Sequence, residues 1–245
     1  MTNRVLIDAS HPQEMRLVVS DEKNNVSEID FQNAKNQHSK GNVYLAKIAR
    51  IEPSLQAAFI EYGNDRNGFL PFSEIHPDYF QISSAEKEKL LQKIEELNAS
   101  NESTTGRSDF ASRRQYNELF AEFKIQEVVK KDQIILVQLT KETRGSKGAA
   151  FSTYISIPGR FCVYMPNSPS QGGISKKIAE AEERDRLKGL LDEFHSKQSN
   201  QGSVIIRTAG EFKTKTEIRR DFDYTVKLWN NIKENALNST APCFV

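Results

Sequence analysis

Cysteine is scarce in this sequence of 245 residues, which contains only Cys162 and Cys243. The two lie far apart, and neither belongs to a CxxC pair or has a histidine at the spacing of a zinc site. Two cysteines cannot form the set of disulfides that holds small secreted domains together. The sequence therefore argues against a disulfide scaffold and against a zinc site made by this chain alone. We expect a reduced, cytoplasmic protein.

A long apolar run and an excess of charge of one sign are also missing. No run is long enough to span a bilayer, and the N-terminus lacks the charged, apolar and small-residue zones of a signal peptide. The 34 basic and 33 acidic residues give a net charge of +1. No overall positive field is therefore available to attract nucleic acid, and any such site has to be a local patch.

Short extended segments dominate the first two thirds of the chain. Alternating apolar residues and a polar turn at residues 21–25 predict strands at 4–7, 15–19 and 26–31. From residue 41 onward the same signals predict five more short strands, at 43–48, 57–62, 68–71, 133–140 and 149–157. Five short strands fit a small β-barrel of the OB type.

A polar insertion at about residues 82–126 interrupts the predicted barrel. It should contain a helix that Ser84 caps and that runs to about residue 98, and a second helix over residues 110–123. We interpret it as a solvated spacer. The last third alternates between strand and helix, with strands predicted at 161–165 and 204–206 and helices at 176–194 and 217–237.

Two phenylalanines flank a glycine-containing hairpin of the predicted barrel. Phe59 and Phe69 have Lys47, Arg50 and Arg66 nearby in the sequence. Aromatic side chains on the surface of an OB-type barrel stack the bases of single-stranded nucleic acid, each worth about 1–3 kcal/mol. The alternative is that both phenylalanines are core residues, which is the usual position of this residue type. The pattern alone favours the core.

Two further groups of residues could bind phosphate. The loop Lys141–Gly148 carries three cations and two glycines, so its backbone can approach a phosphate chain closely, although a solvated loop explains it equally well. Arg207 and Thr208 follow an apolar strand and could together offer three hydrogen bonds to a phosphate. Backbone N–H groups near Gly159 could serve the same anion. Residues 172–177 form a basic turn at the start of a predicted helix, where the helix dipole favours anions.

Four strings in this sequence resemble, in the same order, those of the ribonuclease E/G family: IARIEPSLQAAFIEYGNDRNGFLP, KETRGSKGAAFSTYISIPGR, MPNSPSQGGISKKI and IIRTAG. The resemblance covers nearly the whole chain apart from the insertion. It implies an α+β chain of three subdomains. These are an RNase H-like piece over residues 1–38, an OB-type RNA-binding barrel with a helical insertion over 39–155, and an α/β 5′-sensor subdomain over 156–245.

The resemblance also implies the residues that bind single-stranded RNA. The set that contacts the RNA strand would be Phe59, Phe69, Lys147 and Lys176. The set that binds a 5′-monophosphate would be Gly159, Val163, Arg207 and Thr208, with Val163 acting through its backbone. Lys176 stands where the family has an arginine, which keeps the charge but loses the planar fork of donors.

Catalysis is expected outside this sequence. The family is a group of single-strand-specific endoribonucleases of RNA processing and decay, in which two aspartates of a later domain hold Mg²⁺ and a cysteine pair shares Zn²⁺ between subunits of a homo-oligomer. The sequence ends before both features, so we expect a truncated member with no catalytic residue or metal ligand. A non-catalytic RNA-binding or regulatory module is the alternative. Asp8, on the first strand, is expected in a turn rather than at a metal.

Overall fold

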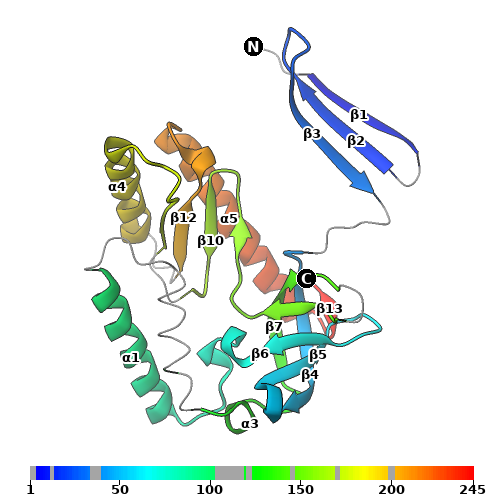
Figure 1. Cartoon of the computed structure of the whole chain (residues 1–245), viewed down its shortest axis with the longest axis vertical. Coiled ribbons are helices and arrows are strands. Elements are labelled where there is room, and N and C mark those ends of the chain that lie inside the picture. The colour runs from blue at the N-terminus through cyan, green and yellow to red at the C-terminus, as the bar shows by residue number, and fades with distance from the viewer. Residues whose placement is uncertain are drawn as a thin grey trace. The chain divides into compact units, whose positions relative to one another are not determined.

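The structure is a computed structural model that describes residues 4–11, 14–33, 40–102, 119, 123–143, 147–168, 172–197 and 202–245. The chain forms two compact units, Met1–Ser39 and Lys40–Val245. Each is described by itself (Figure 1). The second unit contains both the predicted barrel and the predicted sensor subdomain.

The first unit is a three-stranded antiparallel sheet in the order β1-β2-β3. Its strands are β1 (Arg4–His11), β2 (Glu14–Ser20) and β3 (Val26–Asn33). The turn before β3 forms because the carboxylate of Asp21 accepts the N–H groups of Lys23 and Asn25, both at 2.8 Å. The predicted strands and turn are confirmed. The RNase H-like identity of this piece stays a prediction, because such a sheet occurs in many folds.

Asp8 lies where the pairing of β1 with β2 becomes irregular. Its carboxylate accepts the N–H of Ser10 at 3.0 Å, as in an Asx turn. The turn role expected for Asp8 is therefore confirmed.

Apolar side chains of this sheet are exposed on both faces. Val5, Leu6 and Ile7 are successive residues of β1, so they point alternately to the two faces, and each is more than half exposed. None of the apolar side chains described in this unit belongs to a buried core. The sheet can therefore contribute little apolar burial of its own.

A closed five-stranded barrel begins the second unit. Its strands are β4 (Val43–Glu52), β5 (Ala57–Glu61), β6 (Gly68–Pro71), β7 (Ile134–Lys141) and β8 (Ala150–Ser152). They follow the order β4-β5-β6-β8-β7, and pairing of β7 with β4 closes the barrel. Only the contact between β6 and β8 is parallel. This is the predicted barrel of the OB type.

The fifth predicted strand, residues 149–157, is divided in the structure. Its first part is β8, whereas its last part is β9 (Ile157–Pro158), which belongs to another sheet. The sequence also gave no indication of β13 (Cys243–Phe244), which pairs with β4. Leu45 of β4 pairs with β13 on one edge and with β7 on the other. Strand β13 therefore lies on the edge of β4 that also pairs with β5.

Alternating residues of the barrel strands fill its core. Ile48, Ile60 and Leu70 are fully buried there. A side chain at Gly68 would collide with the ring of Phe151, so this position accepts only glycine. Three short 3-10 helices connect or follow the strands: η1 (Pro53–Leu55), η2 (Phe72–Glu74) and η3 (Pro77–Tyr79).

The insertion packs onto the barrel core, so its interpretation as a solvated spacer is wrong. Helix α1 (Ser84–Glu102) contributes buried Leu90 and Ile94, and α3 (Ile125–Val128) contributes two further buried residues. The cap of α1 is Ser83, whose hydroxyl accepts the N–H of Glu86, rather than the predicted Ser84. The second predicted helix, over residues 110–123, falls almost wholly outside the described residues.

A second sheet carries two helices on one face (Figure 1). Its strands, in the order β11-β12-β10-β9, are β11 (Gly172–Ile174), β12 (Ser203–Ile206), β10 (Cys162–Met165) and β9. Helices α4 (Ala181–Lys197) and α5 (Lys215–Asn238) cover it, and their Phe194 and Phe222 rings stack at 5.0 Å. A last 3-10 helix, η4 (Thr208–Gly210), follows β12. The predicted helix over 176–194 therefore begins later, and a strand precedes it.

Strand β4 takes part in both cores of the second unit. Val43, near its start, is buried in the core under α4 and α5, whereas Ala46 and Ile48 are buried in the barrel. The two cores therefore share one continuous strand. Across the part of the chain that the structure describes, none of the helices combines the length and apolar character needed to cross a bilayer.

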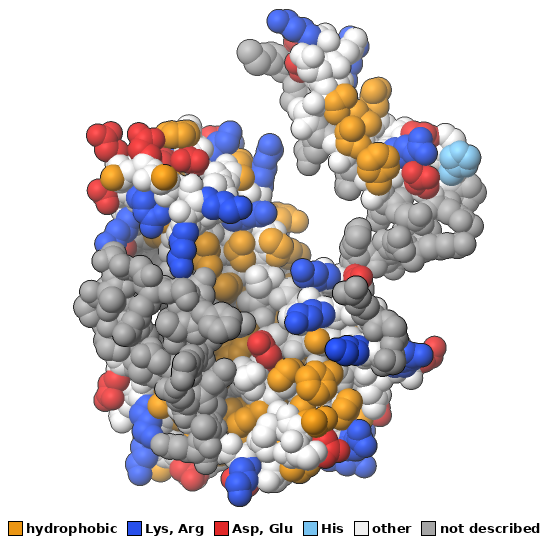
Figure 2. Space-filling view, viewed as in Figure 1, with side chains coloured by type: hydrophobic (Ala, Val, Ile, Leu, Met, Phe, Trp, Pro, Cys, Tyr) orange, Lys and Arg blue, Asp and Glu red, His pale blue; other side chains and the backbone are white. Residues whose placement is uncertain are grey.

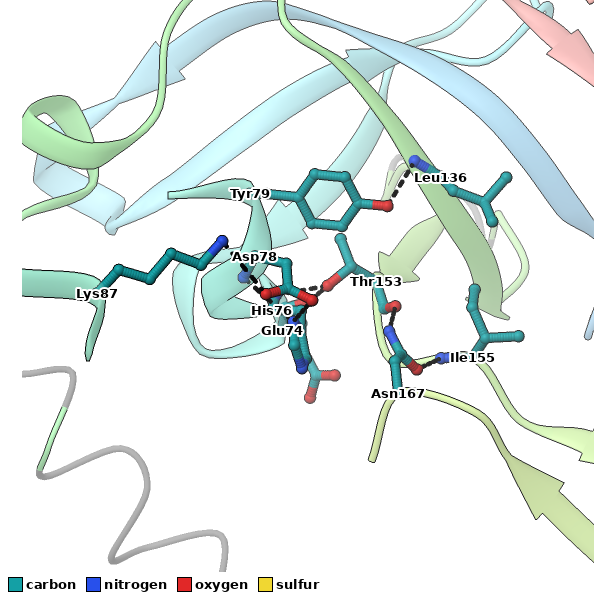
Figure 3. A network of polar contacts seen from close by, with 9 residues as sticks. All are labelled: Glu74, His76, Asp78, Tyr79, Lys87, Leu136, Thr153, Ile155 and Asn167. Carbon is teal, nitrogen blue, oxygen red and sulfur yellow. Dashed lines mark hydrogen bonds and ion pairs between the residues drawn. The ribbon is translucent and has the colours of Figure 1, made fainter. Parts of the chain in front are cut away.

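A polar network joins the barrel to the second sheet (Figure 3). The carbonyl of Glu74 accepts both the N–H of Thr153, at 2.8 Å, and its hydroxyl, at 2.9 Å. The same hydroxyl accepts the N–H of His76 at 2.6 Å. Asn167, beyond β10, accepts the N–H of Ile155 at 2.9 Å and donates to the carbonyl of Thr153 at 2.7 Å. The segment between β8 and β9 therefore finds its partners in the carbonyl of Glu74 and the side chain of Asn167 instead of a neighbouring strand.

Four more side chains extend this network (Figure 3). The Tyr79 hydroxyl accepts the N–H of Leu136 at 3.2 Å, at a point of β7 that β8 does not reach. Asp78 lies 3.4 Å from both His76 Nδ1 and Lys87 Nζ. The hydrogen bond with His76, together with the charge of Lys87, lowers the pKa of Asp78 to about 2. The start of α1 is thereby tied to the barrel.

We predict that Asn167→Ala destabilises the second unit by about 1–3 kcal/mol, because it leaves the N–H of Ile155 and the carbonyl of Thr153 without partners. Urea unfolding followed by circular dichroism measures the change. Asn238→Ala, at the exposed end of α5, is the matched control and should change the free energy of unfolding little. Equal effects of the two substitutions would contradict the prediction.

Candidate nucleic-acid interface

A row of three side chains crosses the outer face of the barrel. Arg50 on β4 pairs directly with Phe59 on β5, and Phe59 pairs with Phe69 on β6. Directly paired residues place their side chains on the same face of a sheet. The two rings are 5.9 Å apart at 66°, and Cζ of Arg50 lies 4.7 Å from the centre of the Phe59 ring. We call these three residues the aromatic row.

The aromatic row lies outside the barrel core. Phe59 and Phe69 are partly exposed, whereas their strand neighbours Ile60 and Leu70 are fully buried. The interpretation of the two phenylalanines as core residues, which the pattern alone favours, is therefore wrong. The space-filling view shows hydrophobic side chains over the barrel with Lys and Arg side chains beside them (Figure 2).

Lys147 lies beside the aromatic row. The N–H of Phe69 donates to the carbonyl of Ala149 at 2.7 Å, and Gly148 packs against the carbonyl of Asn67. This brings the exposed Lys147 next to the start of β6. Residues 144–146 of the predicted basic loop fall outside the described residues.

The cations near the aromatic row differ in what they bind. Nζ of Lys47 forms an ion pair with Asp132 at 2.8 Å. The hydrogen bond with Asp132 raises the pKa of Lys47. Arg50 and Lys147 are exposed, and they can reach the phosphates of a strand whose bases lie on the rings.

At one end of the second sheet, a loop folds around the carboxylate of Asp221 from α5. The carboxylate accepts the N–H groups of Arg160 at 2.9 Å, Phe161 at 2.8 Å and Cys162 at 3.0 Å. Burial raises the pKa of Asp221, but these backbone hydrogen bonds lower it more, so that its pKa lies below the ordinary 3.8. An ionised carboxylate therefore holds the turn between β9 and β10.

Gly159 begins this loop and touches Arg207. A side chain at Gly159 would collide with the Asp221 carboxylate, so only glycine fits there. Its N–H donates to the carbonyl of Cys162 at 2.8 Å, and its own carbonyl accepts Nη1 of Arg207 at 2.7 Å. The N–H groups of residues 159–162 are therefore all engaged, which corrects the expectation that those of Gly159 and the start of the neighbouring strand bind an anion.

Lys176 lies next to the end of β12. The N–H of Ser175 donates to the carbonyl of Ile206 at 2.8 Å, and β11 runs parallel to β12. Nη1 of Arg184 binds the carbonyls of Ser175, at 3.1 Å, and Ile178, at 3.0 Å, and so fixes the turn that carries Lys176. Since α4 begins only at Ala181, the predicted contribution of a helix N-terminus at this turn is wrong.

The structure thus brings Gly159, Lys176, Arg207 and Thr208 to one end of the sheet, and we call them the Arg207 cluster. Arg207 and Thr208 are exposed, and within the described part of the chain the guanidinium makes its one hydrogen bond to Gly159. Val163 pairs with Pro158 and Ile205 in the sheet, on the face away from the helices. The side-chain donors that the Arg207 cluster offers to an anion are the guanidinium of Arg207, the hydroxyl of Thr208 and the ammonium of Lys176.

Sequence reasoning missed Asp221 and Arg184. The partners of Asp221 are backbone groups 59, 60 and 61 residues away, and Arg184 binds carbonyl groups. Contacts of this kind leave no pattern of residue types in the sequence. Both residues lie on helices that the spacing of apolar residues does predict.

Acidic and sulfur-containing side chains meet only as a pair at Cys162 and Asp221 among the hydrogen bonds of the described residues. Among the residues described, no group of three or more His, Cys, Asp and Glu could hold a metal ion. Burial, together with the Asp221 carboxylate, raises the pKa of the Cys162 thiol, which keeps it protonated. The described His, Cys, Asp and Glu residues therefore do not fit a Mg²⁺ or Zn²⁺ site. The two metals that the resemblance to the ribonuclease E/G family implies stay predictions for other parts of a whole protein.

Comparison with known proteins supports two assignments along the chain. A family model for the S1 RNA binding domain matches residues 37–153, which include the barrel. A model for the ribonuclease E/G family matches residues 156–245, which include the second sheet and its helices.

Individual relatives match nearly the whole chain. Ribonuclease E of Buchnera aphidicola subsp. Acyrthosiphon pisum (strain APS) is 36% identical over 99% of this chain and 23% of its own length. Ribonuclease E of Escherichia coli (strain K12) is 34% identical over 99% of this chain and 19% of its own length. Ribonuclease G of Escherichia coli (strain K12) is 29% identical over 96% of this chain and 40% of its own length. The chain therefore spans less than half the length of these three relatives.

We predict that Asp221→Asn destabilises the second unit by about 1–3 kcal/mol, because an amide cannot accept all three N–H groups. The lowered pKa of Asp221 gives stability that is present above pH 3.8 and is lost as pH falls through the folded value. The variant should lack this part of the acid dependence. Urea unfolding between pH 3 and 7 measures both effects.

Asp223→Asn, two residues further along α5 and exposed, is the matched control for Asp221→Asn. It should keep the acid dependence of the original chain. If both variants titrate like the original chain, the role given to Asp221 is wrong.

Proposed function

We propose that this chain binds RNA as one part of an endoribonuclease. It carries an S1 RNA-binding domain, and its residues 156–245 belong to the ribonuclease E/G family. In this proposal it is the RNA-binding and 5′-end-sensing part of a single-strand-specific enzyme. The observation that carries the proposal is the pairing of Arg50, Phe59 and Phe69 in one exposed row on the barrel. Such a row suits unpaired bases.

The aromatic row supports single-stranded RNA as the ligand. Bases stack on aromatic rings only when they are not stacked inside a duplex, and stacking tolerates any sequence. Arg50 and Lys147 lie where they can neutralise the phosphates of the same strand. The binding energy would therefore come from ring contact and charge rather than from reading individual bases.

The Arg207 cluster supports recognition of a 5′-monophosphate. Gly159 orients the guanidinium of Arg207 by one hydrogen bond, and a planar guanidinium can offer two parallel N–H groups to a phosphate. Thr208 adds a hydroxyl donor, and Lys176 adds a charge. A 5′-hydroxyl end lacks the anion for these groups.

For the whole protein we propose what its named relatives suggest, which is hydrolysis of RNA in RNA processing and decay. We propose that Mg²⁺ and the residues that cut, together with Zn²⁺ and a homo-oligomer contact, belong to parts of the whole protein outside this chain, and we propose a cytoplasmic location. The alternative is an RNA-binding or regulatory module that does not cut. Incubation of the purified chain with Mg²⁺ and a 5′-monophosphorylated, AU-rich oligonucleotide tests this division, and cleavage would overturn it.

We predict that Phe59→Ala and Phe69→Ala each weaken binding of a single-stranded oligonucleotide by about 1–3 kcal/mol, through the loss of a stacking surface. Fluorescence anisotropy measures the affinity. The free energy of unfolding should fall by less than the 3–5 kcal/mol typical of a buried phenylalanine, because both rings are partly exposed. Ile134→Ala, another exposed apolar residue of the barrel, is the control. Equal losses of affinity at all three positions would refute the assignment.

We predict that the original chain binds a 5′-monophosphorylated oligonucleotide more tightly than its 5′-hydroxyl counterpart, and that Arg207→Ala removes this preference. Arg207→Lys should keep only part of it, because a lysine lacks the planar fork. Binding to the 5′-hydroxyl oligonucleotide should be nearly unchanged, since the aromatic row is intact. Lys227→Ala, exposed on α5, is the control. An original chain without the preference would refute the 5′-sensing role.

A further inference from the structure

An aromatic side chain is exposed just beyond the Arg207 cluster. Phe212 is 70% exposed, and its backbone has φ 56°, in the left-handed region. A bulky side chain is strained there, and glycine is the residue that normally occupies such a position. The other described non-glycine residues with positive φ are polar: Asn24, Gln56 and Asp132. Neither burial nor an easy backbone conformation therefore explains a phenylalanine at this position.

An ion pair between the buried carboxylate of Glu183 and the exposed Arg186 fixes the backbone of Phe212. Its N–H donates to Oε1 of Glu183 at 2.9 Å, and Glu183 is only 6% exposed. Arg186 binds both carboxylate oxygens of Glu183, at 2.6 and 2.7 Å, and donates to the carbonyl of Lys213 at 3.0 Å. The exposed ring is thus attached to a backbone that is held on both sides.

Tight turns keep Phe212 close to Arg207. The N–H of Gly210 donates to the carbonyl of Arg207 at 2.9 Å, and that of Lys213 donates to Gly210 at 3.3 Å. Phe161 touches both ends of this segment: its carbonyl accepts the N–H of Arg207 at 2.8 Å, and its ring centre lies 5.6 Å from Nζ of Lys213. Phe212 therefore projects from the same small area as the Arg207 cluster.

The ring of Phe161 is already occupied by cations. Cζ of Arg160 lies 5.4 Å from its centre, in addition to Lys213. Phe161 is also partly buried against the second core. Phe212 is the aromatic side chain of this area that remains exposed.

We propose that Phe212 is the stacking surface for the base of the 5′-terminal nucleotide, whose phosphate lies at the Arg207 cluster. This assignment rests on the proposed function and adds a base contact to it. A base is attached to the same nucleotide as the terminal phosphate, so a ring beside the phosphate donors is where the base would meet it. Stacking has little preference among bases, and the contact would serve to grip any RNA by its first nucleotide.

The test compares 5′-monophosphorylated oligonucleotides that have, or lack, the base of the first nucleotide. Removal of this base should weaken binding to the original chain by about fivefold to 160-fold, the range that corresponds to one stacked base. Phe212→Gly should bind both oligonucleotides equally, at the weaker level. Phe212→Trp should restore the difference, since it restores a ring. Tyr224→Ala, at another exposed aromatic residue, should behave like the original chain.

Stability separates a binding role of Phe212 from a structural one. Glycine relieves the left-handed backbone, so Phe212→Gly should unfold at the same or a higher temperature than the original chain while it binds more weakly. A lower unfolding temperature, together with weaker binding of both oligonucleotides, would assign Phe212 to folding and overturn the proposal.

Two outcomes distinguish this proposal from the function on which it rests. If the original chain prefers a 5′-monophosphate but Phe212→Gly still discriminates against the abasic oligonucleotide, the role of Phe212 is refuted and the 5′-sensing function stands. If the original chain shows no preference for a 5′-monophosphate over a 5′-hydroxyl, the function and the role of Phe212 fail together.

Discussion

The carboxylate of Asp221 is the constraint on which one end of the second sheet depends. It gathers three consecutive N–H groups, and its closeness to the backbone makes glycine necessary at residue 159. The carbonyl of Gly159 in turn orients Arg207. The helix that carries Asp221 is packed through Phe222 against the core. A partly buried charge thus links the position of α5 to an exposed guanidinium, and the backbone donors it occupies are withheld from any other anion.

The two surfaces of the second unit rely on different physical interactions. The aromatic row offers ring faces, which bind through contact and depend weakly on salt, whereas the Arg207 cluster offers charge and directed hydrogen bonds, which salt weakens. In the proposed function the barrel provides affinity for any unpaired strand, and the cluster adds a preference for one chemical form of its end. This division explains why the chain needs no overall positive charge to bind RNA.

Alternation of apolar residues located most strands of the fold, because each barrel strand buries one face. It could not locate the break within residues 149–157, since there the backbone is bonded by the side chain of Asn167, which comes later in the sequence. Composition placed Phe59 in the core by default, and only the closed barrel shows that its face is outward. The resemblance to the ribonuclease E/G family indicated Arg207. The part that Asp221 plays in holding residues 160–162 became visible only in the structure, since its partners are backbone groups.

Strand β4 links the barrel core to the core beneath α4 and α5, with Val43 in one and Ile48 in the other. Because one continuous strand contributes to both cores, the aromatic row and the Arg207 cluster belong to the same compact unit. An RNA whose 5′ end occupied the Arg207 cluster could reach the aromatic row only after a set minimum number of nucleotides. The fold would thereby measure length along the RNA, independently of its sequence.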